Sequence, residues 1–195
     1  MKTHHTFFKQ ITKLTLLFVM GLAITACGAG SEKWKEEVQL SDGKIIVVER
    51  ELVLESGGDE WASNRSGVKP KENRIRFPSL DNSEKTVEWH SIKKSPQTYP
   101  EIPLILDVIS GQLVIFSSVA RAGGCQMYSK YIYQNATWVE EKLPPSFEQH
   151  ATNLYIFQNE GLSFINLQKK RENIEDMRNI WAVTVGPTHP NCKGL

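Results

Sequence analysis

Residues 34–54 read Trp-Lys-Glu-Glu-Val-Gln-Leu-Ser-Asp-Gly-Lys-Ile-Ile-Val-Val-Glu-Arg-Glu-Leu-Val-Leu, and this stretch decides the fold class. Its centre, Ser41-Asp42-Gly43, is a strong turn signal, because glycine after aspartate adopts positive φ without steric cost. The segment 45–48 that follows is β-branched throughout, which suits a pleated strand better than a helix. The stretch therefore predicts a β-hairpin with strands at 34–40 and 44–54.

The same combination of apolar stretches and turn residues predicts four more hairpins. Working outward from the first, their strands are expected at 74–77 and 87–90, at 104–109 and 113–116, at 126–133 and 137–143, and at 153–157 and 162–167. The apolar runs within 104–116 are continuous and do not alternate, which predicts burial on both faces of that sheet. Residues 168–180 alone show helical spacing, and 181–185 either continue the helix or form a last strand.

These elements predict a mostly β protein. We expect a single antiparallel β domain built from sequential hairpins, with one C-terminal helix. The pattern leaves a meander, a sandwich and a partial barrel as alternatives. Residues 34–195 are long enough for one domain with a proper hydrophobic core.

Residues 56–73 are expected to form a loop of about 18 residues, which is longer than usual for a compact domain. This loop holds the candidate binding residues Asp59, Glu60 and Trp61. Two carboxylates beside an aromatic ring resemble a sugar-binding group, and a solvated loop tip is the alternative interpretation. Loops of this length often carry function, so the segment is the sequence's candidate binding loop.

The N-terminus has the composition of a secretory signal. Lys2, Lys9 and Lys13 are the only charged side chains before Glu32, and residues 14–26 form an uncharged, mostly apolar run. As a helix, this run would extend about 20 Å, which is too short for a hydrocarbon core of about 30 Å. A cleaved signal is therefore favoured over a transmembrane anchor.

The end of that run, Ile24-Thr25-Ala26-Cys27, resembles the lipobox of bacterial lipoproteins. The resemblance implies that the Cys27 thiol receives a diacylglycerol and that the chain is cut before it. An ordinary signal with a cysteine near its cleavage site is the alternative. Two or three acyl chains on one residue anchor a protein to a membrane without spanning it.

This resemblance sets the expected organisation of the chain. Residues 1–26 form the signal peptide, 27–33 the lipidated tether and 34–195 the β-rich domain. Aspartate after the lipidated cysteine favours the inner membrane in such lipoproteins, and here Gly28 takes that position. The expected location is therefore the cell envelope, with the periplasmic face of the outer membrane favoured over the inner membrane.

The two remaining cysteines, Cys125 and Cys192, predict a disulfide, because an even pair in an oxidising compartment usually pairs. The bond would close a loop of about 68 residues and, in the chain-entropy model, stabilise the fold by about 4 kcal/mol. A nucleophilic or metal-binding thiol is the alternative interpretation.

The sequence contains no recognisable catalytic constellation. Its histidines after the signal, His90, His150 and His189, lack metal-ligand spacing, and neither a nucleophile elbow nor a phosphate-binding glycine loop is present. Lys169-Lys170-Arg171 is interpreted as a solvated helix face, with a basic patch for lipid or a partner as the alternative. We therefore expect no catalytic residue, no metal and no cofactor.

The near balance of 23 basic and 22 acidic residues gives no reason to expect a nucleic-acid partner. The domain as a whole is similar to small uncharacterised envelope lipoproteins of proteobacteria, in stretches such as Asp59-Glu60-Trp61-Ala62-Ser63-Asn64 and Tyr128-Ser129-Lys130-Tyr131. That resemblance transfers no activity and no site.

An anchored, disulfide-closed β domain without a catalytic group predicts a non-enzymatic binding or interaction lipoprotein. Its partners would be the membrane, through the lipid on Cys27, and a protein of the envelope. An immunity protein and a subunit of an envelope assembly are two versions of this role. The alternative is an envelope hydrolase acting on glycan or lipid, with the 56–73 loop as its site.

Overall fold

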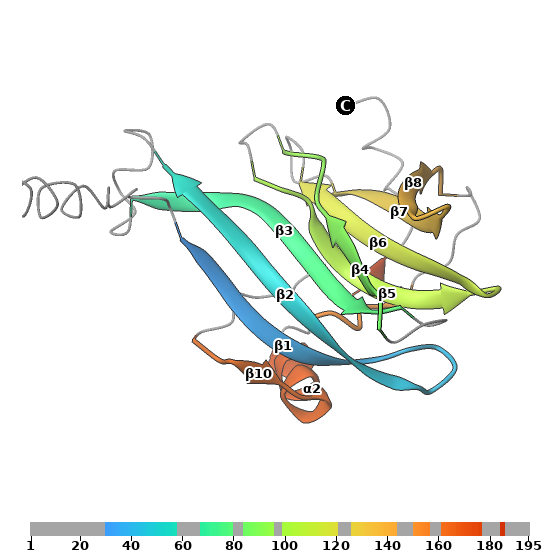
Figure 1. Cartoon of the computed structure of the whole chain (residues 1–195). Coiled ribbons are helices and arrows are strands. Elements are labelled where there is room, and N and C mark those ends of the chain that lie inside the picture. Colours follow the sequence, from blue (N-terminus) through green and yellow to red (C-terminus); the bar gives the residue numbers. More distant parts are fainter. Residues whose placement is uncertain are drawn as a thin grey trace, which may run out of the picture.

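The computed structural model describes residues 30–57, 67–79, 84–95, 99–120, 126–143, 150–156, 161–176 and 184–185. These residues form a mostly β protein of two large sheets, which do not close into a barrel, with a short helix near the C-terminus (Figure 1). The predicted fold class is therefore confirmed. No helix in this part of the chain is long and apolar enough to cross a membrane.

The first sheet contains five strands in the order β10-β1-β2-β3-β4. Their bounds are β1 Ser31–Gln39, β2 Ile45–Ser56, β3 Val68–Pro78, β4 Thr86–His90 and β10 Phe164–Ile165. The pairings are antiparallel except that β10 runs parallel to β1. The hairpin that the sequence places around Asp42 and Gly43 is confirmed, and Gly43 has the positive φ of 85° that the turn requires.

The second sheet has four strands in the order β5-β6-β7-β8, and a separate pair joins β9 to β11. Their bounds are β5 Ile102–Ile109, β6 Gln112–Ala120, β7 Gln126–Gln134, β8 Thr137–Glu141, β9 His150–Ala151 and β11 Thr184–Val185. The predicted hairpins of β5 with β6 and of β7 with β8 are thus confirmed, as is that of β3 with β4. Of the two alternatives for 181–185, the structure shows a strand at its end.

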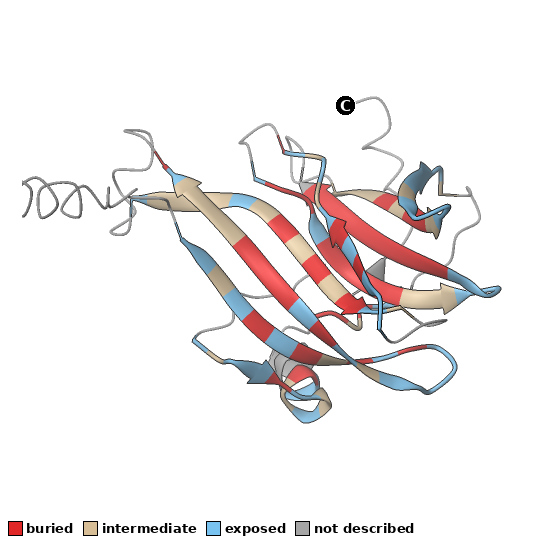
Figure 2. Cartoon of the chain, in the orientation of Figure 1, coloured by how far each residue is buried: buried red, intermediate tan, exposed pale blue. Residues whose placement is uncertain are grey.

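The main core lies between the two sheets. In β1, β3 and β4, alternate side chains turn inward, which appears in Figure 2 as buried bands alternating with intermediate or exposed ones. This core contains Val38, Leu40, Val48, Ile75, Phe77, Val87 and Trp89, which meet Leu106, Leu113, Ile115, Tyr131 and Leu154. The other face of the second sheet is covered as well, with Leu104, Ile105, Val114, Phe116 and Ile132 in a second cluster. The predicted burial on both faces is therefore confirmed for 104–106 and 113–116, whereas 107–112 are half-buried or exposed.

The outer face of the first sheet carries charges of alternating sign. Glu51 lies at its centre, 3.3 Å from Lys33 and 2.9 Å from Arg76 in ion pairs, and Lys35 pairs with Glu49 at 3.2 Å. Burial alone would raise the pKa of Glu51, but hydrogen bonds from Ser31, Arg76 and Lys33 outweigh it and lower that pKa. This face is a cross-strand charge ladder.

The expected loop at 56–73 is wrong in its second half, because β3 begins at Val68. The polar run 69–72 and Pro70 argued against a strand. Pro70 pairs with Leu54 next to a register shift in β2, and it lies beyond the part of β3 that pairs with β4. An irregular position without a partner strand on one side is where a sheet tolerates proline.

The fifth predicted hairpin, 153–157 with 162–167, is not formed. Residues 153–156 have no strand structure, and Phe164–Ile165 pairs with β1 instead. Asn153 bonds through its side chain to the backbone of Leu106, with its Nδ2 2.8 Å from the carbonyl oxygen and its Oδ1 3.0 Å from the amide. Contacts with two sheets therefore override the local hairpin pattern.

Helix α2 spans Leu167–Asp176, whereas the sequence predicts 168–180. Asn166 caps its start, accepting a hydrogen bond from the Lys169 amide on its side-chain oxygen at 2.9 Å. The helix lies beside β1 and β10 (Figure 1). Residues 177–183 lie outside the described residues, so the predicted C-terminal part of the helix stays a prediction.

Candidate functional site

An apolar pocket of about 410 Å³ lies at the end of the first sheet where β1 begins and β2 ends. Its volume falls in the range of pockets that hold small ligands, roughly 300–1,000 Å³. One wall comes from β1, β2 and β3, and the others come from the segment before β5, from β6 and β7, and from residues 155–156. The lining residues are Trp34, Arg50, Leu52, Pro70, Asn73, Ser95, Tyr99, Pro100, Ile102, Ser118, Gln126, Tyr155 and Ile156.

Strand alternation places Trp34 and Arg50 side by side in this wall. Both belong to the inward-facing set of their strands, and they are partners in the register of β1 with β2. The Arg50 guanidinium carbon lies 5.2 Å from the centre of the Trp34 ring, close enough for a cation–π interaction. The side chains are 3% and 5% exposed, so the pocket has a buried cation and a buried indole on one wall.

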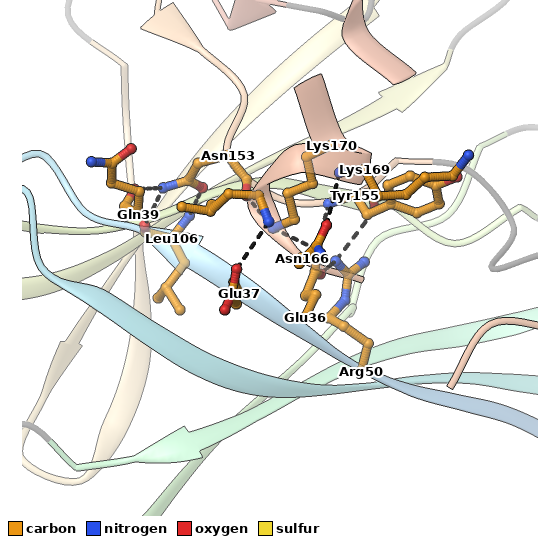
Figure 3. Close-up of polar contacts among 11 residues, drawn as sticks. Glu36, Glu37, Gln39, Arg50, Leu106, Asn153, Tyr155, Asn166, Lys169 and Lys170 are labelled. Atoms are coloured by element: carbon orange, nitrogen blue, oxygen red, sulfur yellow. Dashed lines mark hydrogen bonds and ion pairs between the residues drawn. The ribbon is translucent and has the colours of Figure 1, made fainter. Parts of the chain in front are cut away.

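Arg50 belongs to a buried cluster of charges that also contains Glu36 and Lys170 (Figure 3). The Arg50 Nη1 atom lies 2.5 Å from Glu36 Oε1, and Lys170 Nζ lies 2.7 Å from Glu36 Oε2. The amide of Tyr155 donates to Glu36 Oε2 at 2.8 Å, and Lys170 also donates to the carbonyl oxygen of Asn153 at 2.6 Å. One carboxylate therefore holds β1, β2, α2 and the 153–156 segment together.

The cluster has two cations for one fully buried carboxylate. Burial lowers the pKa of Lys170, and the nearby Arg50 charge lowers it further, whereas Glu36 and the half-buried Glu37 act in the opposite direction. Charges out of contact with water are stable only when they are paired. The three buried side chains thus carry one net positive charge, which the half-buried Glu37 offsets only in part.

Two polar atoms of the pocket wall have no hydrogen-bond partner. They are the indole Nε1 of Trp34, a donor, and the side-chain Oε1 of Gln126, an acceptor, and both are buried. A buried polar group without a partner costs about 1–3 kcal/mol, so natural proteins leave few of them. A buried donor and a buried acceptor without protein partners, both on residues that line one pocket, indicate a ligand site.

A second fully buried carboxylate, Glu101, lies where the two sheets meet. Its oxygens accept hydrogen bonds from the amides of Ile92 and Lys93 at 2.9 and 3.2 Å, from Ser117 Oγ at 2.7 Å and from the Tyr131 hydroxyl at 3.0 Å. Burial and the Glu101 charge raise the pKa of Tyr131. All these donors are neutral and all are satisfied, so Glu101 is a structural joint between the sheets.

A second hollow, of about 610 Å³, lies between the turn after β5 and the start of β4. Its rim residues Lys85, Gly111, Gln112 and Ala136 are exposed, and no unpartnered buried polar atom lines it. Within the described ranges, no group of three or more His, Cys, Asp or Glu side chains is placed to hold a metal ion. The pocket beside Trp34 and Arg50 is therefore the candidate site.

Most of the site residues predicted from the sequence lie outside the described part of the chain. Asp59, Glu60 and Trp61, Cys27, and Cys125 with Cys192 lie outside the described residues, so the structure does not place them. His90 is exposed at the end of β4, while the side chain of His150 and all of His189 lie outside the described part.

The interpretation of 169–171 as a solvated helix face is wrong for one residue. Lys170 is only 7% exposed, because its ammonium group reaches Glu36 under the first sheet. A run of three basic residues is typical of a solvated helix face, so the local sequence did not indicate that Lys170 is buried.

Sequence reasoning also missed Trp34, Glu36 and Arg50. A signal was present in the first hairpin, where Trp34, Glu36 and Val38 alternate on one face and meet Val48 and Arg50 across the turn. Two charged residues on the apolar face of a hairpin predict a buried ion pair.

A comparison with known proteins finds no family model, no curated protein and no solved structure that matches the chain.

Proposed function

We propose that the protein is a lipid-anchored envelope protein whose role is binding and not catalysis, and that the pocket beside Trp34 and Arg50 is its ligand site. One observation carries this proposal. The pocket joins apolar walls to a buried unpaired donor, Trp34 Nε1, and a buried unpaired acceptor, Gln126 Oε1. Ligand sites combine a mostly apolar lining with a few convergent polar groups in this way.

The proposed anchor supports this choice of site. A lipobox at 24–27 would put the acyl chains on Cys27, four residues before the first residue of β1. An extended chain covers at most about 3.6 Å per residue, so Trp34 lies within roughly 25 Å of Cys27. The pocket would thus lie close to the membrane surface, where apolar molecules are concentrated. The proposed location is the periplasmic face of the outer membrane.

The test begins with the chain from residue 27 to 195, exported with Cys27→Ser so that it carries no lipid of its own. This chain contains every residue that the structure describes. The purified protein is extracted with organic solvent, and the extract is analysed by mass spectrometry for small molecules retained in stoichiometric amount. Binding in the pocket predicts a retained molecule that Ser118→Phe, which fills the pocket from β6, releases.

Ser56→Phe is the matched control, because Ser56 is exposed at the end of β2, outside the pocket lining. Retention of the molecule by the control and its loss from Ser118→Phe, with both variants folded, would support the proposal. If instead the folded protein captures an envelope protein that Ser118→Phe still binds, the pocket is not the site. A protein-interaction role, as in immunity or envelope assembly, would then replace the proposal.

A further inference from the structure

We propose that the ligand of this pocket is a long-chain fatty acid, whose carboxylate lies against Arg50 and Trp34 and whose alkyl chain follows the apolar walls. The inference rests on the proposed function and deepens it, because it names the class of ligand. Three features of the described residues carry it: the charge of the buried cluster, the unpaired indole donor, and the apolar mouth.

The charge of the cluster favours an anionic head group. Among the described residues, Glu36 is the one fully buried carboxylate that contacts Arg50 and Lys170, so these three side chains carry one net positive charge that the half-buried Glu37 offsets only in part. An arginine has five N–H donors, and the bonds from Arg50 to Glu36 and to the Tyr155 carbonyl both leave from Nη1. Its other donors are therefore available to a second acceptor, and a planar carboxylate matches the geometry of a guanidinium.

The unpaired donor favours an acceptor in the same place. Trp34 Nε1 is buried without a partner, and the Trp34 ring stacks against the Arg50 guanidinium. A ligand oxygen beside Arg50 would satisfy this N–H group, whereas an alkyl chain would leave it unpaired. Gln126 faces the pocket with a side-chain amide, which donates to a carboxylate once the amide is turned over.

The mouth of the pocket favours an alkyl chain. Tyr99 and Ile102 line the pocket and are each 42% exposed, so apolar surface continues from the interior to the outside. Leu52 and Ile156 extend the same apolar surface inward. A molecule with one anionic end and one apolar end fits this arrangement better than a uniformly polar or a uniformly apolar one.

The test compares two ligands of the same chain length, palmitate and the uncharged alcohol hexadecanol. Both are titrated by calorimetry into the delipidated chain 27–195 with Cys27→Ser. We expect palmitate to bind at least about tenfold more tightly, because a hydrogen-bonded charge is worth more than a neutral hydrogen bond. Arg50→Gln should remove this preference while leaving the Glu36–Lys170 pair intact.

Trp34→Phe separates a ligand contact from a structural role. The variant loses the N–H group that has no partner in the protein and keeps an aromatic ring in the core cluster with Leu52 and Ile165, so it should stay folded with a moderately lower melting temperature, whereas palmitate should bind roughly tenfold more weakly. Lys35→Gln is the charge-matched control for Arg50→Gln, because Lys35 belongs to the same hairpin but lies exposed in an ion pair with Glu49 on the outer face. It should leave both affinities unchanged.

Two outcomes would overturn different statements. Equal affinities for palmitate and hexadecanol would overturn the anionic-head inference and leave the pocket as an apolar ligand site. If the folded chain binds neither ligand and retains no molecule from envelope extracts, the proposed function itself is wrong.

Discussion

Glu36 and Glu101 are both completely buried, yet the protein stabilises their negative charges in different ways. Glu36 meets two cations, Arg50 and Lys170, whereas Glu101 is held by backbone amides and hydroxyl groups and by no cation in the described part of the chain. The first arrangement leaves a positive surplus beside a pocket, and the second leaves a closed hydrogen-bond shell. One side-chain type thus marks a binding wall in one region and a structural joint in another.

The largest effect is expected from Glu36→Gln. This change keeps the shape of the side chain but leaves Arg50 and Lys170 buried without the carboxylate that contacts both of them. Removal of one partner from a buried ion pair typically costs about 3–5 kcal/mol of the free energy of unfolding. Chemical denaturation would measure the loss, with Glu49→Gln in the exposed Lys35 pair as a control that should cost less than about 1 kcal/mol. Equal losses of unfolding free energy in Glu36→Gln and Glu49→Gln would contradict the role of Glu36 as the counter-charge of Arg50 and Lys170.

Glu101→Gln should have a smaller effect, about 1–3 kcal/mol, because the neutral donors around it lose an acceptor but no buried charge is left unpaired. The same denaturation experiment measures it. A loss larger than that of Glu36→Gln would mean that the hydrogen-bond shell contributes more than the ion pairs, and the comparison would be reversed.

Lys170→Met should change stability by less than about 1 kcal/mol. The variant removes the surplus cation and leaves Glu36 paired with Arg50, while the apolar stem still fills the space under the sheet. Removing the surplus buried cation favours folding, but the carbonyl oxygen of Asn153 loses its hydrogen-bond donor, which offsets part of that stabilisation. Thermal unfolding beside wild type is the measurement, and a loss as large as that of Glu36→Gln would show that both cations are needed.

The pH dependence of stability distinguishes the two regions in alkaline solution. Burial and the Glu101 charge raise the pKa of Tyr131 above its ordinary value of 10.0. The unfolded chain therefore loses this proton first, and stability falls as the pH rises above about 10. For Lys170, whose pKa burial lowers below 10.5, the folded chain loses its proton first, so stability rises with pH in that window.

Denaturation at several pH values would measure both trends. Tyr131→Phe should reduce the fall above pH 10 but not abolish it, because burial raises the pKa of Tyr128 as well. Lys170→Met should remove the rise in stability that Lys170 contributes. A Tyr131→Phe variant with an unchanged alkaline profile would contradict the assigned role of Glu101.

Much of the fold was predictable from local signals. Turn residues such as Asp42 with Gly43, and Ser110 with Gly111, predicted hairpins that the structure contains, because such turns fix the register of the strands that they join. The strand beginning at Val68 was missed, because Pro70 and the charges around it oppose a strand locally. The hairpin expected at 153–167 was wrong, because Asn153 and Ile165 bond to other strands.

The candidate site was far less predictable. The sequence pointed to the loop around Trp61, whereas the structure brings together Trp34, Arg50 and Gln126 from strands distant in the chain. Alternation shows that Trp34 and Arg50 face inward, but it does not show which elements cover them.

By itself, the sequence determined the β class, four of the hairpins and the lipobox-like N-terminus, because each depends on residues close together in the chain. Only the tertiary structure decided how the sheets pack, that Lys170 is buried, and that a pocket opens beside Arg50. These features depend on contacts such as that between Glu36 and Lys170, which lie in different elements. Local sequence patterns fix the geometry of a strand or a turn, whereas the environment of a charge is set by whichever segments fold against it.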